Sequence, residues 1–283
     1  MSITAASIAA LQRLDAVDGP LPVHSIFRSG VNLRCGDYLV HAGTRPLGGA
    51  CSLAVTQRDV ELLGRHPAWK WAFNMLVALD GRAVIDMGEA AQCYPTSPPE
   101  SIAVCADTPG QLQRARARTD AESWFDSGLG RSKGLPRLRE AIRALVEGRA
   151  DAGERLRGII GLGAGLTPSA DDALVGALCL VSAADRTSLA GLREDMTGWL
   201  RAEGAGSTTD VSLSYLRLAL DGEFSVPVNR VVGSLTKRSS PAEVDESVCA
   251  LAALGATSGM DTALGIQLAC EFLTRPTHDP DPS

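Results

Sequence analysis

A glycine-rich segment that runs directly into an apolar helix is the feature that most constrains the fold. Three glycines occur in five residues of Gly161-Leu162-Gly163-Ala164-Gly165, which lets the backbone turn sharply or approach a ligand closely. Thr167 and Pro168 follow and predict an N-cap and a first helical position. Residues 173–181 are apolar on almost every face, which predicts a buried helix. A helix start that carries two carboxylates, Asp171 and Asp172, is therefore expected inside the protein.

A second segment near the end of the chain repeats this arrangement. Residues 255–266 again place glycine, hydroxyl side chains and an aspartate, Asp261, before an apolar helix. Asp172 and Asp261 each precede a glycine by four residues, so Asp and Gly share one helix face. Glycines there permit close contact between helices. We expect the two helix starts to converge and to form a pocket from backbone N–H groups, hydroxyls and carboxylates, closed on one side by the N-terminal sheet.

The two halves of the chain differ in their pattern of apolar residues, and together they predict an α/β protein of the α+β kind. Residues 1–107 carry short apolar runs between turns, which predict a small mixed β-sheet with strands at 31–33, 38–41, 51–55, 82–86 and 101–104 and an irregular helical segment at 57–79. Residues 108–273 predict a larger helical half with helices at 136–147, 168–184, 189–201, 210–220, 241–254 and 259–273. The tail, 274–283, is rich in Pro and Asp and predicts disorder.

Composition excludes several classes of function. The net charge of −6 argues against a broad nucleic-acid surface, which needs clustered Lys and Arg. The low aromatic content, 4%, argues against nucleobase stacking, although Trp69 and Trp71 are candidates for an interface. No signal peptide and no long apolar run appear. Seven scattered cysteines without a C-x-x-C pair predict buried free thiols in a reducing compartment, so we expect a cytoplasmic protein.

The chain resembles a bacterial family typified by AllH, a subunit of oxamate carbamoyltransferase. The segment 161–176 is similar to the family signature G-x-G-x-G-L-T-P-S-G-D-D-x-x-x-G, with Ala164 and Ala170 in place of the usual proline and glycine. Further similarity lies at 208–212 and 258–262, and at the opening from His24 to Leu33. The resemblance implies carbamoyl transfer between oxalurate plus phosphate and oxamate plus carbamoyl phosphate. It also implies other subunits as partners, and a homo-oligomer stays open as an alternative.

The candidate site follows from the chemistry of an anionic substrate. A glycine loop that enters a helix start supplies backbone donors for a phosphate. Asp171, Asp172 or Asp261 then orients an amide, acts as a base or holds Mg²⁺. The candidate catalytic residues are these three aspartates, and the candidate substrate-binding residues are Gly163, Gly165, Thr167, Ser169, Ser258, Thr262, Thr208, Thr209, Arg28 and Asn32. Arg28 and Arg45 are considered as charge clamps for a carboxylate or phosphate.

Other interpretations stay open on the sequence alone. Carboxylates favour the positive end of a helix dipole, so the acids and the hydroxyls at 208–209 and 258 also fit plain helix capping. The glycine segment is neither a P-loop nor a dinucleotide fingerprint, because the residues that must follow are absent. The chain is thus expected to be a carbamoyltransferase or a subunit of one. The alternatives are a non-catalytic small-anion-binding or scaffold subunit and, less favoured, a metal-dependent hydrolase.

Overall fold

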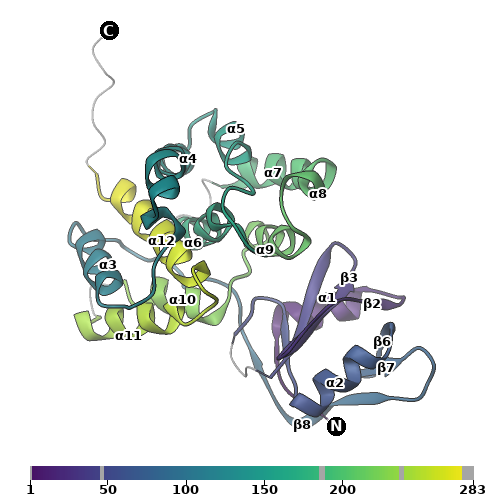
Figure 1. Cartoon of the computed structure of the whole chain (residues 1–283). Helices are drawn as coiled ribbons and strands as arrows, with labels where there is room; N and C mark the ends of the chain where they lie inside the picture. The colour runs from purple at the N-terminus through teal and green to yellow at the C-terminus, as the bar shows by residue number, and fades with distance from the viewer. Residues whose placement is uncertain (1, 45–47, 185–188, 236–238, 276–283) are drawn as a thin grey trace. The chain divides into compact units, whose positions relative to one another are not determined.

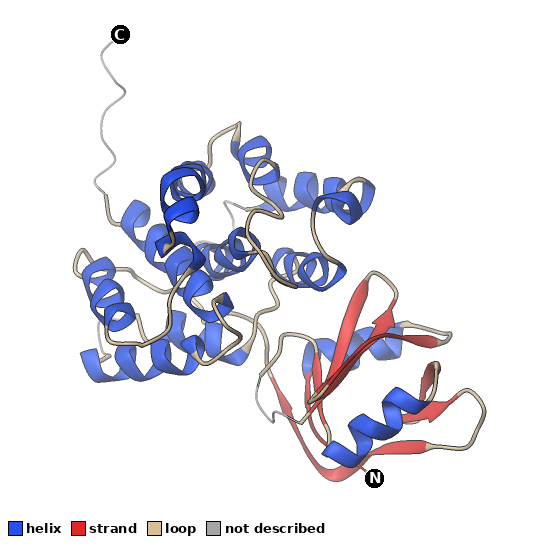
Figure 2. Ribbon diagram, viewed as in Figure 1, coloured by secondary structure: helices blue, strands red, loops and turns tan. Residues whose placement is uncertain are grey.

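The chain folds into two units, each with its own core. A computed structural model describes residues 2–44, 48–184, 189–235 and 239–275. Unit 1 comprises Met1–Ser97 and Glu223–Val226, and unit 2 comprises Pro98–Gly222 and Pro227–Ser283. The predicted disordered tail lies outside the described residues beyond residue 275. Figure 1 labels the elements of both units, and Figure 2 distinguishes their helices from their strands.

Unit 1 is built on a closed β-barrel with the strand order β1-β5-β4-β3-β2-β6-β7-β8. Strand β1 closes it, pairing in parallel with β8 and antiparallel with β5. The β4–β5 pair is also parallel, so the sheet is mixed as predicted. The strands are Ser2–Ser7, Leu21–Phe27, Gly30–Cys35, Tyr38–Gly43, Ser52–Ala54, Ala68–Ala72, Met75–Ala78 and Val84–Tyr94, with helices α1 (Ile8–Ala16) and α2 (Gln57–Arg65).

Four expectations for this half are corrected. The sheet closes into a barrel instead of staying a small sheet, because the first and last strands pair. Residues 57–79 are helical only in α2 and continue as the β6–β7 hairpin, where alternate side chains are buried. Trp69 and Trp71 are buried in unit 1, so neither serves an interface. Residues 101–104 form no strand; instead the Ile102 amide donates to the Ala183 carbonyl within unit 2.

Unit 2 contains only helices among its described residues. The predicted helices are all present as α4 (Leu135–Val146), α6 (Ser169–Ala184), α7 (Ala190–Ala202), α9 (Asp210–Leu220), α11 (Pro241–Ala252) and α12 (Ser258–Leu273). Shorter elements were not predicted: α3 (Thr108–Ala117), η1 (Trp124–Asp126), η2 (Gly130–Gly134), α5 (Ala152–Arg157), α8 (Gly204–Ser207) and α10 (Val226–Gly233). Helices α6 and α12 are buried along most of their length and form the centre of the unit.

The structure also bears on the predictions of buried free thiols and of a chain without long apolar helices. All seven thiols are free, and four of them are buried, whereas Cys93 and Cys249 are exposed and contradict the prediction of buried thiols. Within the described ranges, no helix combines the length and the apolar character that a membrane span requires.

Candidate functional site

The glycine loop needs glycine at specific positions. The φ angles are +80° at Gly161, +124° at Gly163 and +97° at Gly165, a region that other residues rarely adopt. A Cβ on Gly161 would lie 2.0 Å from the Ser207 carbonyl oxygen, and one on Gly163 would lie 2.5 Å from the Ser169 nitrogen. The loop is therefore packed tightly against Ser207, at the end of α8, and against Ser169, at the start of α6. Gly165 itself has open space around it.

The exposed end of the loop presents free backbone donors. None of the five amides from Gly163 to Thr167 donates a hydrogen bond to any residue that the structure describes. Ala164, Gly165 and Leu166 are exposed to solvent. Consecutive unpaired N–H groups beside a helix start are the arrangement with which proteins bind phosphates and carboxylates.

Asp171 holds this loop to the rest of unit 2. Its Oδ1 accepts from the Gly161 amide at 2.8 Å, and its Oδ2 accepts from Thr208 Oγ1 at 2.5 Å and Ser212 Oγ at 2.6 Å. Burial raises the pKa of this carboxyl, and the three hydrogen bonds oppose that rise. With both oxygens occupied, Asp171 serves to position the loop and the start of α9.

Helices α6 and α12 cross at their starts, as the paired glycines predict. A Cβ on Gly176 would lie 2.2 Å from the Thr262 carbonyl oxygen, and one on Gly265 would lie 1.8 Å from that of Ala173. The contact is therefore backbone against backbone on both sides. It brings Thr167 Oγ1 to 2.8 Å from Ser258 Oγ.

Asp172 is the carboxyl whose environment is most unusual. Burial raises its pKa to about 8, the hydroxyls of Ser258 and Thr167 lower it, and the charges of Asp261 and Asp171 raise it further. At neutral pH this side chain is therefore mainly a neutral acid that can donate a hydrogen bond. Its Oδ2 is buried and has no hydrogen-bond partner.

Asp261 occupies the corresponding position on α12. It is fully buried, and its Oδ1 accepts from Ser123 Oγ and from the Trp124 amide at 3.0 Å. Burial raises its pKa, and hydroxyls that include Ser169 Oγ oppose that rise. Nevertheless Asp261 Oδ2 and Ser169 Oγ, both buried, complete no hydrogen bond of adequate geometry.

The crossing thus concentrates unpaired polar atoms. Asp172 Oδ2, Asp261 Oδ2 and Ser169 Oγ come from the first turns of two helices that meet there. A buried polar atom without a partner costs free energy, of the order of 1–3 kcal/mol. Their concentration makes the crossing a candidate site for a ligand that supplies the missing partners.

The other predicted residues have partners of their own. Thr209 caps α9 by accepting from the Ser212 amide, and it donates to the Leu166 carbonyl. Thr262 Oγ1 donates to the Ser258 carbonyl at 2.8 Å. The capping interpretation thus holds for Thr209, while Thr208 donates to Asp171.

Two predicted residues belong to unit 1. Asn32 on β3 is buried, with His41 Nδ1 at 2.8 Å from its Oδ1, and its amide donates to Ser25 Oγ at 3.1 Å. Arg28 is exposed after β2. Arg45 lies outside the described residues.

Several residues of the site were missed from the sequence. Ser123 and the Trp124 amide hold Asp261, and Ser212 holds Asp171. The spacing Ser123-x-x-Asp126 is a capping box, which was a usable sign of a helix start. Ser212 lies in the 208–212 segment that resembles the family, but only the fold brings it to Asp171.

The aspartates do not form a magnesium site. Across the residues that the structure describes, no group of three or more His, Cys, Asp or Glu side chains is placed to hold a metal ion. Asp171 uses both oxygens within the protein, so it has none left for a cation. We therefore derive no step through Mg²⁺.

Comparison with known proteins finds a similarity, which lies almost entirely within the helical unit. No solved structure matches the chain. Residues 159–270 match the family model described as oxamate carbamoyltransferase subunit AllH. That range contains the glycine loop, Asp172 and Asp261, and it confirms the resemblance inferred from the motifs. Over residues 159–270, the chain is therefore similar to the family described as oxamate carbamoyltransferase subunit AllH.

Proposed function

We propose that the chain is a carbamoyltransferase-type enzyme subunit whose α6–α12 crossing binds the carbamoyl group. The observation that carries this proposal is the set of three buried, unpaired polar atoms: Asp172 Oδ2, Asp261 Oδ2 and Ser169 Oγ. A carbamoyl group has an NH₂ with two donors and a carbonyl oxygen that accepts. One neutral acid, one carboxylate and one hydroxyl complement such a group.

Each atom has a role that follows from its protonation. Protonated Asp172 donates to the carbamoyl oxygen and stabilises the negative charge that develops there during attack. Asp261 accepts from the NH₂ group, and Ser169 donates or accepts as needed. The free amides of residues 163–167 bind the phosphate.

The reaction is a substitution at the carbamoyl carbon. The nitrogen of a small amide or amine acceptor forms a bond to that carbon, and the bond to the phosphate oxygen breaks. The acceptor nitrogen loses one proton, which the departing phosphate takes. Oxamate as acceptor would give oxalurate, the chemistry that the name of the matching family suggests.

A binding titration tests the site. Carbamoyl phosphate, inorganic phosphate and oxamate are titrated into the purified chain by calorimetry, with Asp172→Ala, Asp261→Asn and Ser169→Ala as variants. We expect each variant to weaken carbamoyl phosphate by about tenfold or more, because each leaves a ligand group unpaired. Asp120→Asn, an exposed aspartate of the same unit, is the matched control. Unchanged affinity in all three variants would contradict the proposal.

A second candidate function is a binding subunit without its own turnover. The matching family is described as a subunit, which favours this alternative for the chain in isolation. Phosphate release from carbamoyl phosphate and oxamate separates the two. Turnover by the chain alone indicates a self-sufficient enzyme, whereas binding without turnover indicates that a partner chain completes the site.

A further inference from the structure

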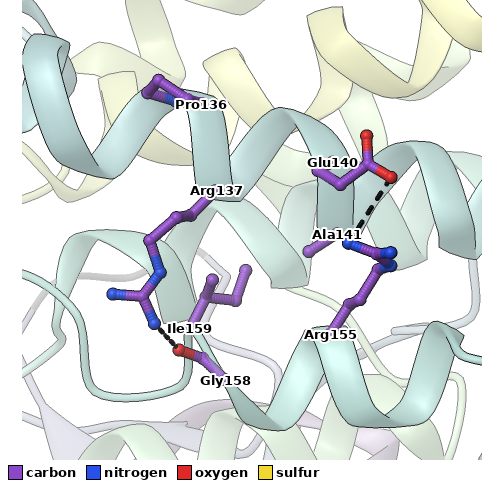
Figure 3. A pocket seen from close by; sticks show the side chains of 7 residues that line it. All are labelled: Pro136, Arg137, Glu140, Ala141, Arg155, Gly158 and Ile159. Atoms are coloured by element: carbon purple, nitrogen blue, oxygen red, sulfur yellow. Dashed lines mark hydrogen bonds and ion pairs between the residues drawn. The ribbon is translucent and has the colours of Figure 1, made fainter.

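A hollow of about 370 Å³ lies in unit 2, away from the aspartates of the crossing. Its lining comes from α4 and from the end of α5: Pro136, Arg137, Glu140, Ala141, Arg155, Gly158 and Ile159 (Figure 3). The volume is at the lower end of the range for small-molecule sites. None of the residues singled out in the sequence lines this hollow.

Two arginines face the hollow from different elements. Arg137 projects from α4 and donates to the Gly158 carbonyl, and Arg155 projects from α5 and lies 3.5 Å from Glu140 (Figure 3). Arg155 also pairs with Asp151 at 2.6 Å. Arg137 forms no ion pair with any described residue, so its positive charge is not compensated.

The surrounding segment is basic in an acidic chain. Residues 131–157 contain eight Lys or Arg and four Asp or Glu, although the whole chain carries a net charge of −6. Other arginines of this segment are neutralised: Arg143 pairs with Glu147, and Arg149 pairs with Glu140 and Asp151. The excess of positive charge at the hollow therefore centres on Arg137.

The floor of the hollow is apolar. Pro136 is the exposed apolar residue of the lining, whereas Ile159 and Ala141 are nearly fully buried. A guanidinium beside an apolar floor suits a molecule with an anionic end and a short apolar body. A fully hydrated ion without such a body would leave the floor uncovered.

We propose that this hollow binds a small organic anion, a carboxylate or a phosphate monoester, with Arg137 as the charged contact. When the anion binds, the Arg137 guanidinium gives up its hydrogen bond to the neutral Gly158 carbonyl and donates to the anion instead. The bond to the anion is stronger because both partners are charged. Arg155 adds a weaker contact, since its own charge is already paired.

Anion binding at Arg137 is expected to affect the glycine loop, because Gly158 is close to the loop in sequence. Gly158 lies three residues before Gly161, and the Ile159 carbonyl accepts from the Leu162 amide at 3.0 Å. Release of Arg137 from Gly158 therefore loosens the turn that leads into the loop. An anion bound in the hollow is expected to change the affinity of the glycine loop for phosphate. This coupling rests on the proposed function, whereas anion binding in the hollow is independent of it.

Calorimetric titration with benzoate, phenyl phosphate, acetate and inorganic phosphate tests this site. We expect the two aromatic anions to bind in the millimolar range and more tightly than acetate and inorganic phosphate, because only they cover the apolar floor. A preference for benzoate identifies a carboxylate site, and a preference for phenyl phosphate identifies a phosphate site. Failure of both aromatic anions to bind overturns the proposal.

Variants locate the binding. Arg137→Gln is expected to weaken the preferred anion by about tenfold, and Arg137→Lys by less, because it keeps the charge. Arg143→Gln is the matched control on the same helix and is expected to bind as the unmodified chain does. Retained affinity in Arg137→Gln, or an equal loss in Arg143→Gln, overturns the assignment. Asp172→Asn leaves this binding unchanged, so failure of the proposed function and failure of this site are distinguishable.

Discussion

The start of α11 and the crossing of α6 with α12 both place a carboxyl in the first turn of a helix, but they treat it in opposite ways. At α11, Ser240 and Glu243 form a capping box on the surface, and hydrogen bonds from Ser240, led by its backbone N–H, lower the pKa of Glu243. At the crossing, burial raises the pKa of Asp172 to about 8. The positive end of the helix dipole is present in both places. Burial therefore decides which protonation state the carboxyl adopts.

The difference matters for function. The capping box at α11 satisfies its own donors and acceptors and has nothing left to offer a ligand. At the crossing, backbone contacts at Gly176 and Gly265 bring two helix starts so close that Asp172, Asp261 and Ser169 keep unpaired atoms. A stable helix start and the proposed binding site thus use the same residue types in different surroundings.

The largest expected effect comes from breaking the crossing itself. Gly265→Ala places a Cβ 1.8 Å from the Ala173 carbonyl oxygen, so the helices must separate. We expect the free energy of unfolding to fall by about 3 kcal/mol or more, as measured by urea denaturation. Gly198→Ala in α7 is the control, since nothing lies within 4 Å of its Cβ. The free energy of unfolding of Gly198→Ala is expected to rise by about 0.5–1 kcal/mol. A similar rise in Gly265→Ala would show that α6 and α12 are not in close contact at Gly265.

The second prediction concerns the pH dependence of stability at Asp172. Because the folded pKa is about 8 against an ordinary value of 3.8, the folded protein holds a proton that the unfolded chain releases. Stability from this group is fully present below pH 3.8 and is lost as the pH rises to about 8. The loss is at most about 1.4 kcal/mol per pH unit.

Asp172→Asn removes this dependence and tests it directly. We expect the variant to be more stable than the unmodified chain at pH 7 and to show a flatter stability profile between pH 4 and pH 8 in urea denaturation. The control Asp120→Asn should keep the original slope. A slope in Asp172→Asn as steep as that of the unmodified chain would place the responsible proton elsewhere, since only the smaller contributions of Asp171 and Asp261 should remain.

The smallest effect is expected at the surface cap. Ser240→Ala removes the N-cap of α11 and lowers the free energy of unfolding by about 1 kcal/mol. Glu243→Gln has a smaller effect, because Glu243 is exposed and its interaction is screened by salt. Its contribution is present above the ordinary carboxyl pKa of 4.5 and is lost as the pH falls. A gain in stability for Glu243→Gln together with a loss for Asp172→Asn at neutral pH would reverse the comparison.

Local patterns predicted the helical unit better than the barrel. Helices such as α4, α6 and α12 carry apolar stripes or runs that reveal them within a dozen residues. The barrel depends on β1, at Ser2–Ser7, pairing with β8, at Val84–Tyr94. Pairing across that separation leaves no local signal, so the sequence predicted a mixed sheet without its closure.

The sequence by itself determined where the helix starts lie, which glycines permit their crossing and which residue types gather there. Only the tertiary structure decided that the adjacent Asp171 and Asp172 differ in role. Asp171 points its oxygens at the Gly161 amide and at the hydroxyls of Thr208 and Ser212, and it is saturated. Asp172 keeps an unpaired oxygen. The physical reason is that hydrogen-bond partners and burial come from segments distant in sequence, and these set the protonation and availability of a carboxyl.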